Sequence, residues 1–330
     1  MSPFCLNIIL KMQGGCAIIV LKDAVLCTCG AFGGFMRISS NIIRVYDAFG
    51  IKRAFDLFSE AGFEAIDFNL DKEEFRDSGY GEEYYRDLAD YARERGLAIG
   101  QAHAPFASSY PKKEDSERRF SEIVESIKSA AYLGAPMIVV HPCMHLDCSL
   151  PGNEEALFEY NVDFYKKLLP YAKAVGIKIA VENIHTSPIT ATPEKHIKLF
   201  DTLADPTFTV CFDVGHSFLA GADPADAIRK LGYRLANGCI HVHDNMGKLD
   251  SHTLPFYGNI DWDSVMRALA EIGYEGNLNY EAANFIAPLP VELYPEGLRY
   301  MASVGNYLIE RFEYYKKELT EKQGQENGKV

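Results

Sequence analysis

The sequence predicts a single (β/α)8 barrel over residues 36–318. Short apolar runs alternate with longer segments in which apolar residues recur at spacings of three and four, and there are eight such units. Eight strand–helix units over about 290 residues suit a (β/α)8 barrel, which typically has about 250 residues. A doubly wound open sheet is the competing architecture. The regular count of eight units and the absence of a Gly-x-Gly-x-x-Gly motif favour the barrel.

The expected strands are apolar runs bounded by polar residues or glycine. In chain order they are 37–43, 64–70, 97–103, 136–142, 177–183, 208–214, 238–244 and 276–282. The clearest helical segments between them are 51–62, 82–96, 118–134 and 157–176. Several helical segments end at glycine, which is the common residue just past a helix C-terminus: Gly62, Gly96, Gly134, Gly176 and Gly273.

The two ends of the chain differ from the barrel region. Residues 1–35 are apolar and rich in glycine and cysteine, but Lys11 and Lys22 interrupt the apolar runs. No run therefore reaches the roughly 20 residues of a membrane helix, and the pattern is not that of a signal peptide. We expect residues 1–35 to be an extension, either an upstream start or a poorly ordered arm. Residues 319–330 are polar and are expected to form a fraying tail.

The composition is typical of a folded, acidic protein. Hydrophobic residues make up 48% of the chain, and the net charge is −13 at pH 7. An acidic surface is a poor platform for phosphate backbones, so no nucleic-acid partner and no membrane association are expected. The eight cysteines include no Cys-x-x-Cys pair. We therefore expect reduced thiols and a cytoplasmic protein.

Side chains that can hold a metal follow or end most of the predicted strands. They are His103, His141, Glu182, Asp213, His241 and Glu281, with His216 three residues after Asp213 and with Asp250 and His252 in the loop after the seventh strand. A single histidine or glutamate at a strand end is usually a paired or solvated group. Active sites of such barrels lie at the carboxyl ends of the strands, where all of these residues would gather. Two Glu, one Asp and one His suit Mn²⁺, Mg²⁺ or Co²⁺, with Zn²⁺ also possible.

The remaining candidates have simpler expectations. His145 and His185 lie in loops past the fourth and fifth strands and could line a pocket. His243 and Asp244 are expected to contact metal ligands without binding the metal. His196 lies in a helical segment and is expected at the solvated surface, and Trp262 is expected to pack rather than to stack on a substrate.

Several short motifs, taken in order, carry a resemblance to a known family. They are "AHAPF", "HPC", "VEN", "DVGH", "HVHDNMGKLDSH" followed by "GNIDW", and "YEAA". Together they resemble the xylose-isomerase-like TIM barrel superfamily, and within it the sugar-phosphate isomerase/epimerase family. The resemblance implies one divalent cation bound by Glu182, Asp213, His241 and Glu281. It also implies that Glu182 and Glu281 are catalytic and that His216 contacts the substrate. From their places at the rim, His103, His141, Asp250 and His252 are expected to contact the substrate as well.

The expected function is therefore that of a sugar isomerase or epimerase. Two glutamates from the fifth and eighth strands would act as acid and base around an enediolate stabilised by the metal. The substrate is a small sugar, and a homo-oligomer is possible. The sequence leaves open whether the sugar is phosphorylated, and whether the reaction is epimerisation or aldose–ketose isomerisation.

Two departures from the family pattern leave alternatives. Ketose epimerases of the family have an arginine after the seventh strand, where this chain has Gly247 and Lys248, and the stretch before "IDW" lacks Gly-Glu-Gly. The superfamily also contains an apurinic endonuclease with three zinc ions, and the chain has candidates for its additional ligands in His103, His141, His216, Asp250 and His252. A non-catalytic sugar-binding barrel is a third possibility. The acidic charge and the two intact glutamates favour the sugar enzyme.

Overall fold

The computed structural model describes residues 9–13, 16–21, 24–27, 36–77, 79–145 and 154–327. The chain divides into two compact units, residues 1–35 and residues 36–330. In the first unit, strands β1 (Ile9–Gln13), β2 (Cys16–Leu21) and β3 (Ala24–Cys27) form an antiparallel sheet in that order. The view of residues 1–35 as an upstream start or arm stays a prediction.

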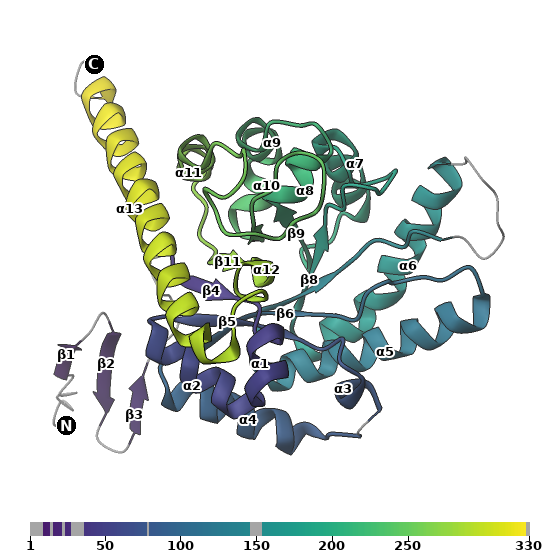
Figure 1. The fold of residues 1–330 in the computed structure, drawn as a ribbon, viewed down its shortest axis with the longest axis horizontal. Helices are drawn as coiled ribbons and strands as arrows, with labels where there is room; N and C mark the ends of the chain where they lie inside the picture. The colour runs from purple at the N-terminus through teal and green to yellow at the C-terminus, as the bar shows by residue number, and fades with distance from the viewer. Residues whose placement is uncertain are drawn as a thin grey trace, which may run out of the picture. The chain divides into compact units, whose positions relative to one another are not determined.

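The second unit is a parallel barrel with all eight predicted strands, which confirms the predicted fold class (Figure 1). Each strand lies within its predicted range. The strands are β4 (Ile38–Ser40), β5 (Ala65–Asn69), β6 (Ala98–His103), β7 (Met137–Val140), β8 (Lys178–Glu182), β9 (Phe208–Asp213), β10 (Cys239–Val242) and β11 (Leu278–Tyr280). Their order around the barrel is β4-β11-β10-β9-β8-β7-β6-β5. A parallel bridge between Asn41 and Asp67 nearly closes the ring.

Helices surround the strands and supply the outer layer of the barrel (Figure 1). They are α1 (Ile43–Phe49), α2 (Ile51–Ala61), α3 (Glu73–Asp77), α4 (Glu82–Glu94), α5 (Lys113–Tyr132), α6 (Glu154–Val175), α7 (Pro193–Leu203), α8 (Val214–Leu219), α9 (Pro224–Leu231), α10 (Tyr233–Ala236), α11 (Trp262–Glu271), α12 (Ala283–Ile286), a 3-10 turn at Val291–Leu293, and α13 (Tyr294–Asn327). The five glycines predicted to end helices all have φ between 66° and 95°, where residues with a Cβ are strained.

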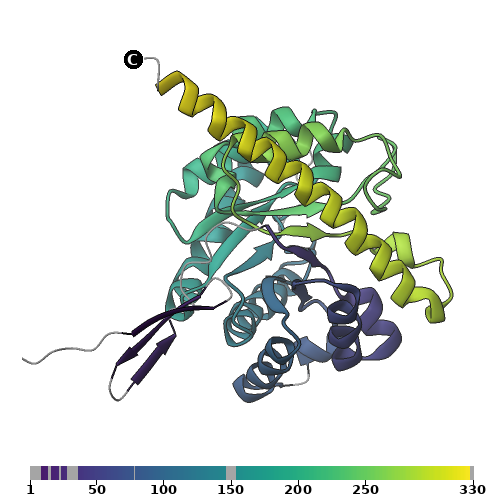
Figure 2. The same ribbon diagram turned by 90° about the vertical axis from the view of Figure 1, so that its left-hand side faces the viewer.

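Helix α13 runs along one side of the barrel and continues to Asn327 (Figure 2). The division of the chain into a barrel and a polar tail at residue 318 stays a prediction. Polar residues beyond that point still favour a helix when opposite charges are spaced by four, as in the Glu318–Lys322 and Lys317–Glu321 pairs. Among the described residues, no helix is both long and apolar enough to cross a membrane.

The interior of the barrel is filled by unusually small and polar side chains. The apolar group inside it consists of Val139, Ala180, Cys211 and Cys239, with Met137 against it. Barrels of this kind usually fill the interior with bulky branched residues. Here the remaining space is taken by buried polar side chains, namely Asp67, Gln101, Asn279 and His241. The large hydrophobic core lies instead between the strands and the surrounding helices.

The prediction that His196 lies at the solvated surface is wrong. Its side chain is 1% exposed, and its Nε2 lies 2.9 Å from the carbonyl oxygen of Val181. The residue shares the buried face of α7 with Leu199 and Leu203, so the helix turns it toward β8. Burial lowers the pKa of His196 to about 4, so the imidazole is neutral at neutral pH.

Candidate metal centre

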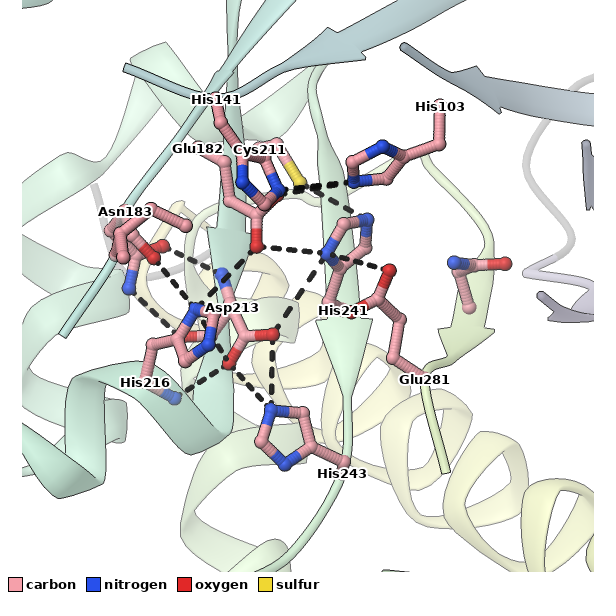
Figure 3. A network of polar contacts seen from close by, with 12 residues as sticks. His103, His141, Glu182, Asn183, Cys211, Asp213, His216, His241, His243 and Glu281 are labelled. Atoms are coloured by element: carbon pink, nitrogen blue, oxygen red, sulfur yellow. Dashed lines mark hydrogen bonds and ion pairs between the residues drawn. The ribbon is translucent and has the colours of Figure 1, made fainter. Parts of the chain in front are cut away.

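Four predicted ligands converge at the carboxyl ends of the strands. Glu182 ends β8, Asp213 ends β9, His241 lies on β10, and Glu281 directly follows β11. Nδ1 of His241 lies 3.2 Å from Glu182 Oε1, 3.4 Å from Glu281 Oε1 and 3.8 Å from Asp213 Oδ2 (Figure 3). One donor atom from each of the four residues lies within 4.8 Å of the others, which is the spacing of ligands around one cation.

Asp213 is held in place by its neighbours on both sides. Its backbone N–H donates to Asn183 Oδ1 at 2.7 Å, and Asn183 Nδ2 donates back to the Asp213 carbonyl oxygen at 2.9 Å. The Asp213 side chain also caps helix α8, because its Oδ1 accepts the backbone N–H of His216 at 2.6 Å. The strand end therefore positions a carboxylate and, one helical turn later, an imidazole. Asn183 was not predicted as part of the site.

A second group of donors shares Glu182 with the first. Nε2 of His141 lies 2.9 Å from Glu182 Oε2, and Nε2 of His103 lies 3.5 Å from the same oxygen. The Nε2 atoms of the two imidazoles lie 3.2 Å apart. The structure thus places His103 and His141 directly beside the predicted metal ligands.

A third group lies on the other side of Asp213. Asp250 Oδ2 is 3.2 Å from Nε2 of both His216 and His252. His243 completes the group: its Nε2 is 3.0 Å from Asp213 Oδ1, and its ring stacks on His252 with centroids 4.0 Å apart. The predicted contact between His243 and a metal ligand is present in this geometry. Gly215 permits the close approach, because a Cβ there would overlap the His243 ring.

Three of the histidines share one hydrogen-bonding pattern. Nδ1 of His103, His216 and His252 lies 2.9, 2.9 and 2.7 Å from the backbone carbonyl oxygens of Ala104, Asn183 and Glu281. Each Nδ1 therefore carries a proton and donates to the carbonyl, which leaves Nε2 facing the carboxylates. Metal-binding histidines commonly have their second ring nitrogen fixed in this way.

The carboxylates and the imidazoles of the centre shift each other's pKa values, in the direction that favours their charged forms. Burial alone would lower the pKa of His103, but its contacts with Glu182 and Glu281 raise that pKa to about 9. His252 is raised to about 9 against its burial, mainly by Asp250. Burial would raise the pKa of Asp213, yet His216 and His243 bring it down to about 2.

These residues fit a bound divalent cation. Glu182 and Asp213 are at most 1% exposed, and the charged groups around them in the described part of the chain are imidazoles and carboxylates only. Buried carboxylates require a compensating cation, and oxygen and imidazole donors suit a divalent metal. Glu182, Asp213, His241 and Glu281 would hold such an ion.

Several of the donor groups line a cavity of about 500 Å³. Its lining comprises Asn41, Ile43, Asn69, His103, Phe106, His141, Glu182, Ile184, His185, His216, Asp250, His252, Glu281 and Ala283. No Lys or Arg of the described residues is in this lining. His185 lines the cavity as one reading of the sequence suggested, whereas His145 is exposed and does not.

Comparison with known proteins gives the family. Residues 55–304 match the family described as xylose isomerase-like TIM barrel. The chain belongs to this family. A relative from Sinorhizobium fredii, y4fM, is 31% identical over 275 residues, which cover 72% of this chain and 82% of the relative.

Two further family relatives carry names that describe reactions. A D-psicose 3-epimerase of Enterocloster bolteae is 24% identical, covering 68% of this chain and 74% of the relative. An inosose dehydratase of Clostridium perfringens is 26% identical, covering 69% and 84% respectively. Both resemblances extend over most of the barrel, and the named reactions suggest that this family member is an enzyme.

Solved structures show the same fold. A D-tagatose 3-epimerase-like protein aligns with a TM-score of 0.69 and 21% identity, covering 86% of this chain and all (100%) of that one. An IolI protein with a bound zinc atom also aligns with a TM-score of 0.69, at 19% identity, covering 85% and 99%. At this level of identity the alignments establish the barrel fold.

The hydrogen-bond partners of Asp244 differ from those expected. Its carboxylate accepts hydrogen bonds from the backbone N–H groups of Asn245, Phe256 and Ile260 at 2.8, 3.0 and 3.3 Å. It also accepts the indole N–H of Trp262 at 2.9 Å. Asp244 therefore holds the loop that carries Asp250 and His252. Trp262 is 1% exposed and packs in the core, as predicted.

Proposed function

We propose that this barrel is a divalent-metal-dependent enzyme that epimerises or isomerises a small, uncharged sugar. The observation that supports this most directly is the pair of glutamates beside one imidazole nitrogen. Glu182 and Glu281 lie 3.2 and 3.4 Å from His241 Nδ1, and they come from strands separated by β9 and β10. Two carboxylates that approach one point from different strands suit the removal of a proton from one face of a carbon and its return on the other.

Each residue has a defined task in this proposal. Glu182, Asp213, His241 and Glu281 would hold a divalent cation, which when bound would supply Lewis-acid polarisation of the sugar carbonyl. Glu281 is 14% exposed on its side chain and lines the cavity, so its carboxylate is available to take the proton next to the carbonyl. Glu182 serves as the acid on the opposite face, and Nε2 of His141 lies 2.9 Å from its Oε2. His103, His216, Asp250 and His252 bind the sugar hydroxyls.

The charge of the cavity supports an unphosphorylated substrate. Phosphate groups are usually bound by Arg, by Lys or by backbone N–H groups at helix ends. The lining instead contains Glu182, Asp250 and Glu281, and none of the described lining residues is Lys or Arg. Psicose and inosose, the compounds in the names of two relatives, are neutral polyhydroxy ketones. The dehydratase name is consistent with the same first step, because loss of water also begins with removal of a proton next to a carbonyl.

The second candidate is a phosphodiesterase resembling the apurinic endonuclease with three zinc ions. It is favoured by the three adjacent donor groups and by the three histidines whose Nδ1 atoms donate to backbone carbonyls. The same cavity lacks cationic side chains among its described lining residues, and the chain carries a net charge of −13. Binding of a polyanion to such a surface is electrostatically unfavourable.

One experiment separates the two candidates. Metal-reconstituted protein is incubated in D₂O with a panel of free ketoses and, separately, with duplex DNA that contains an abasic site. The sugar enzyme predicts deuterium at a carbon next to a ketose carbonyl, with no DNA cleavage, and the Glu281→Gln variant serves as the control. DNA cleavage together with three bound ions per chain, and no sugar exchange, would overturn the proposal.

A further inference from the structure

His241 differs from the other histidines of the centre in how its second nitrogen is held. His103, His216 and His252 each direct Nδ1 at a backbone carbonyl oxygen. His241 has the opposite orientation, with Nδ1 toward the carboxylates and Nε2 toward the barrel interior (Figure 3). Nε2 lies 2.9 Å from the side-chain amide of Gln101 and 3.4 Å from Cys211 Sγ.

The Gln101 amide is itself fixed inside the barrel. Gln101 lies on β6, two residues before His103, and is 2% exposed. The same amide atom that faces His241 lies 3.0 Å from Asp67 Oδ2. Asp67 Oδ2 is in turn 3.1 Å from Asn279 Nδ2, and both residues are fully buried. Nε2 of His241 therefore faces a series of buried side chains, in which Gln101 contacts Asp67 and Asp67 contacts Asn279.

An imidazole can bind a metal through Nδ1 only when its proton is on Nε2. That proton needs an acceptor, because an unpaired buried N–H costs about 1–3 kcal/mol. A thiol sulfur is a weak acceptor, so Cys211 cannot replace an oxygen in this role. A primary amide offers either a donor or an acceptor, and the two are exchanged by a half-turn of the amide group. With its nitrogen toward His241, where that nitrogen also donates to Asp67, Gln101 keeps the proton of His241 on Nδ1. With its oxygen there, an arrangement that requires a proton on Asp67 Oδ2, it keeps Nδ1 free for the metal.

We propose that Gln101, held by Asp67, is a positioning residue that sets the tautomer and the ring orientation of His241, and thereby the metal affinity of the centre. This inference rests on the proposed metal site. Residues that accept the second N–H of a metal-binding histidine commonly change metal affinity about 10–100-fold when they are replaced. Gln101 lies beside the second ring nitrogen of His241 in the same way. In the described part of the chain, no backbone carbonyl oxygen contacts His241 Nε2.

Two variants separate an acceptor role from simple packing. Gln101→Leu removes the amide and keeps a side chain of similar size. Its Kd for Co²⁺ or Mn²⁺, measured by titration calorimetry on metal-stripped protein, is expected to rise about 10–100-fold. The exchange variant Gln101→Glu with Asp67→Asn swaps the amide and the carboxylate, and so places an acceptor directly against His241 Nε2. It is expected to bind at least as tightly as the wild type. Cys211→Ala is the matched control beside the same nitrogen and should change Kd less than about threefold.

A second measurement uses the wild type alone. ¹⁵N spectra of the histidine side chains, recorded with and without Zn²⁺, report which ring nitrogen of His241 carries the proton. The expected result is a protonated Nε2 in the zinc form. The inference is overturned if Gln101→Leu binds within about threefold of the wild type, if the exchange variant binds as weakly as Gln101→Leu, or if Zn²⁺ is bound through Nε2. A wild type that binds no divalent ion would instead remove the proposed metal centre itself.

Discussion

His196 provides a test of the structure that is independent of catalysis. His196 is 1% exposed, and its Nε2 lies 2.9 Å from the Val181 carbonyl oxygen. Its Nδ1 has no hydrogen-bond partner among the described residues. Burial lowers its pKa from 6.5 to about 4. The perturbation is His196→Gln, because glutamine can still donate to the Val181 carbonyl oxygen but does not titrate.

The depressed pKa of His196 links folding to pH with a definite sign. Between pH 6.5 and pH 4 the unfolded chain holds a proton at this position that the folded chain does not. The stabilisation is therefore complete above pH 6.5 and is lost as the pH falls toward 4. One pKa unit corresponds to about 1.4 kcal/mol, so the full effect is about 3 kcal/mol. At pH 5 about 2 kcal/mol of it is already lost.

The assay compares the urea unfolding of the wild type and of His196→Gln at pH 7.5 and pH 5.0, with a chelator present throughout. Groups of the metal centre titrate in both proteins and cancel in the comparison. From pH 7.5 to pH 5.0, the free energy of unfolding of the wild type should fall by about 2 kcal/mol more than that of the variant. Equal pH dependence in the two proteins would show that His196 is solvated, as its sequence context first suggested, and would refute its buried placement.

The other predictions concern the site and its support. Glu182→Gln and Glu281→Gln should each lower kcat by at least about 10²-fold while circular dichroism and Tm stay near wild type, and near-normal kcat in either would exclude the two-base assignment. Activity should disappear on chelation and return with Mn²⁺, Co²⁺ or Mg²⁺, so full turnover by metal-stripped protein would contradict the proposal. Trp262→Phe leaves a buried oxygen of Asp244 with one partner fewer and should cost about 1–3 kcal/mol in urea unfolding, whereas an unchanged midpoint would show that this bond contributes nothing.

The strands and the principal donors could be predicted because the strands of a parallel barrel all end at the same rim, so residues far apart in the sequence meet there. Apolar runs of four to seven residues indicate buried parallel strands, and a polar residue at the end of each run then lies at the carboxyl rim. Glu182 and Asp213 were found in this way, and the structure places them among the donors of one candidate site. The loop residues Asp250 and His252 were found through the motif that contains them, since a loop path does not follow from periodicity.

The residues that were missed had weaker or misread signals. His196, Leu199 and Leu203 follow the spacing of a buried helix face, so the pattern was present, but a histidine beside lysines suggested solvent. Asp67 and Gln101 point into the barrel two residues before Asn69 and His103, and both pairs are in register across β5 and β6. A strand alternates its faces, so a polar residue two positions before a rim residue indicates the layer beneath the site. Asp244 was misassigned because its partners lie 12 to 18 residues later in the chain.

The charges of the centre explain how one arrangement can serve both the metal-free and the metal-bound protein. Carboxylates buried as deeply as Glu182 and Asp213 would destabilise the fold if they were left uncompensated. In the metal-free protein the imidazoles supply the compensation, which is why the pKa of His103 is raised to about 9 against its burial. The proposed divalent cation would replace that charge, and because it requires neutral imidazoles, its binding would release protons. The strands therefore hold the donors without the metal, and in the proposed metal centre a cation would displace protons from them.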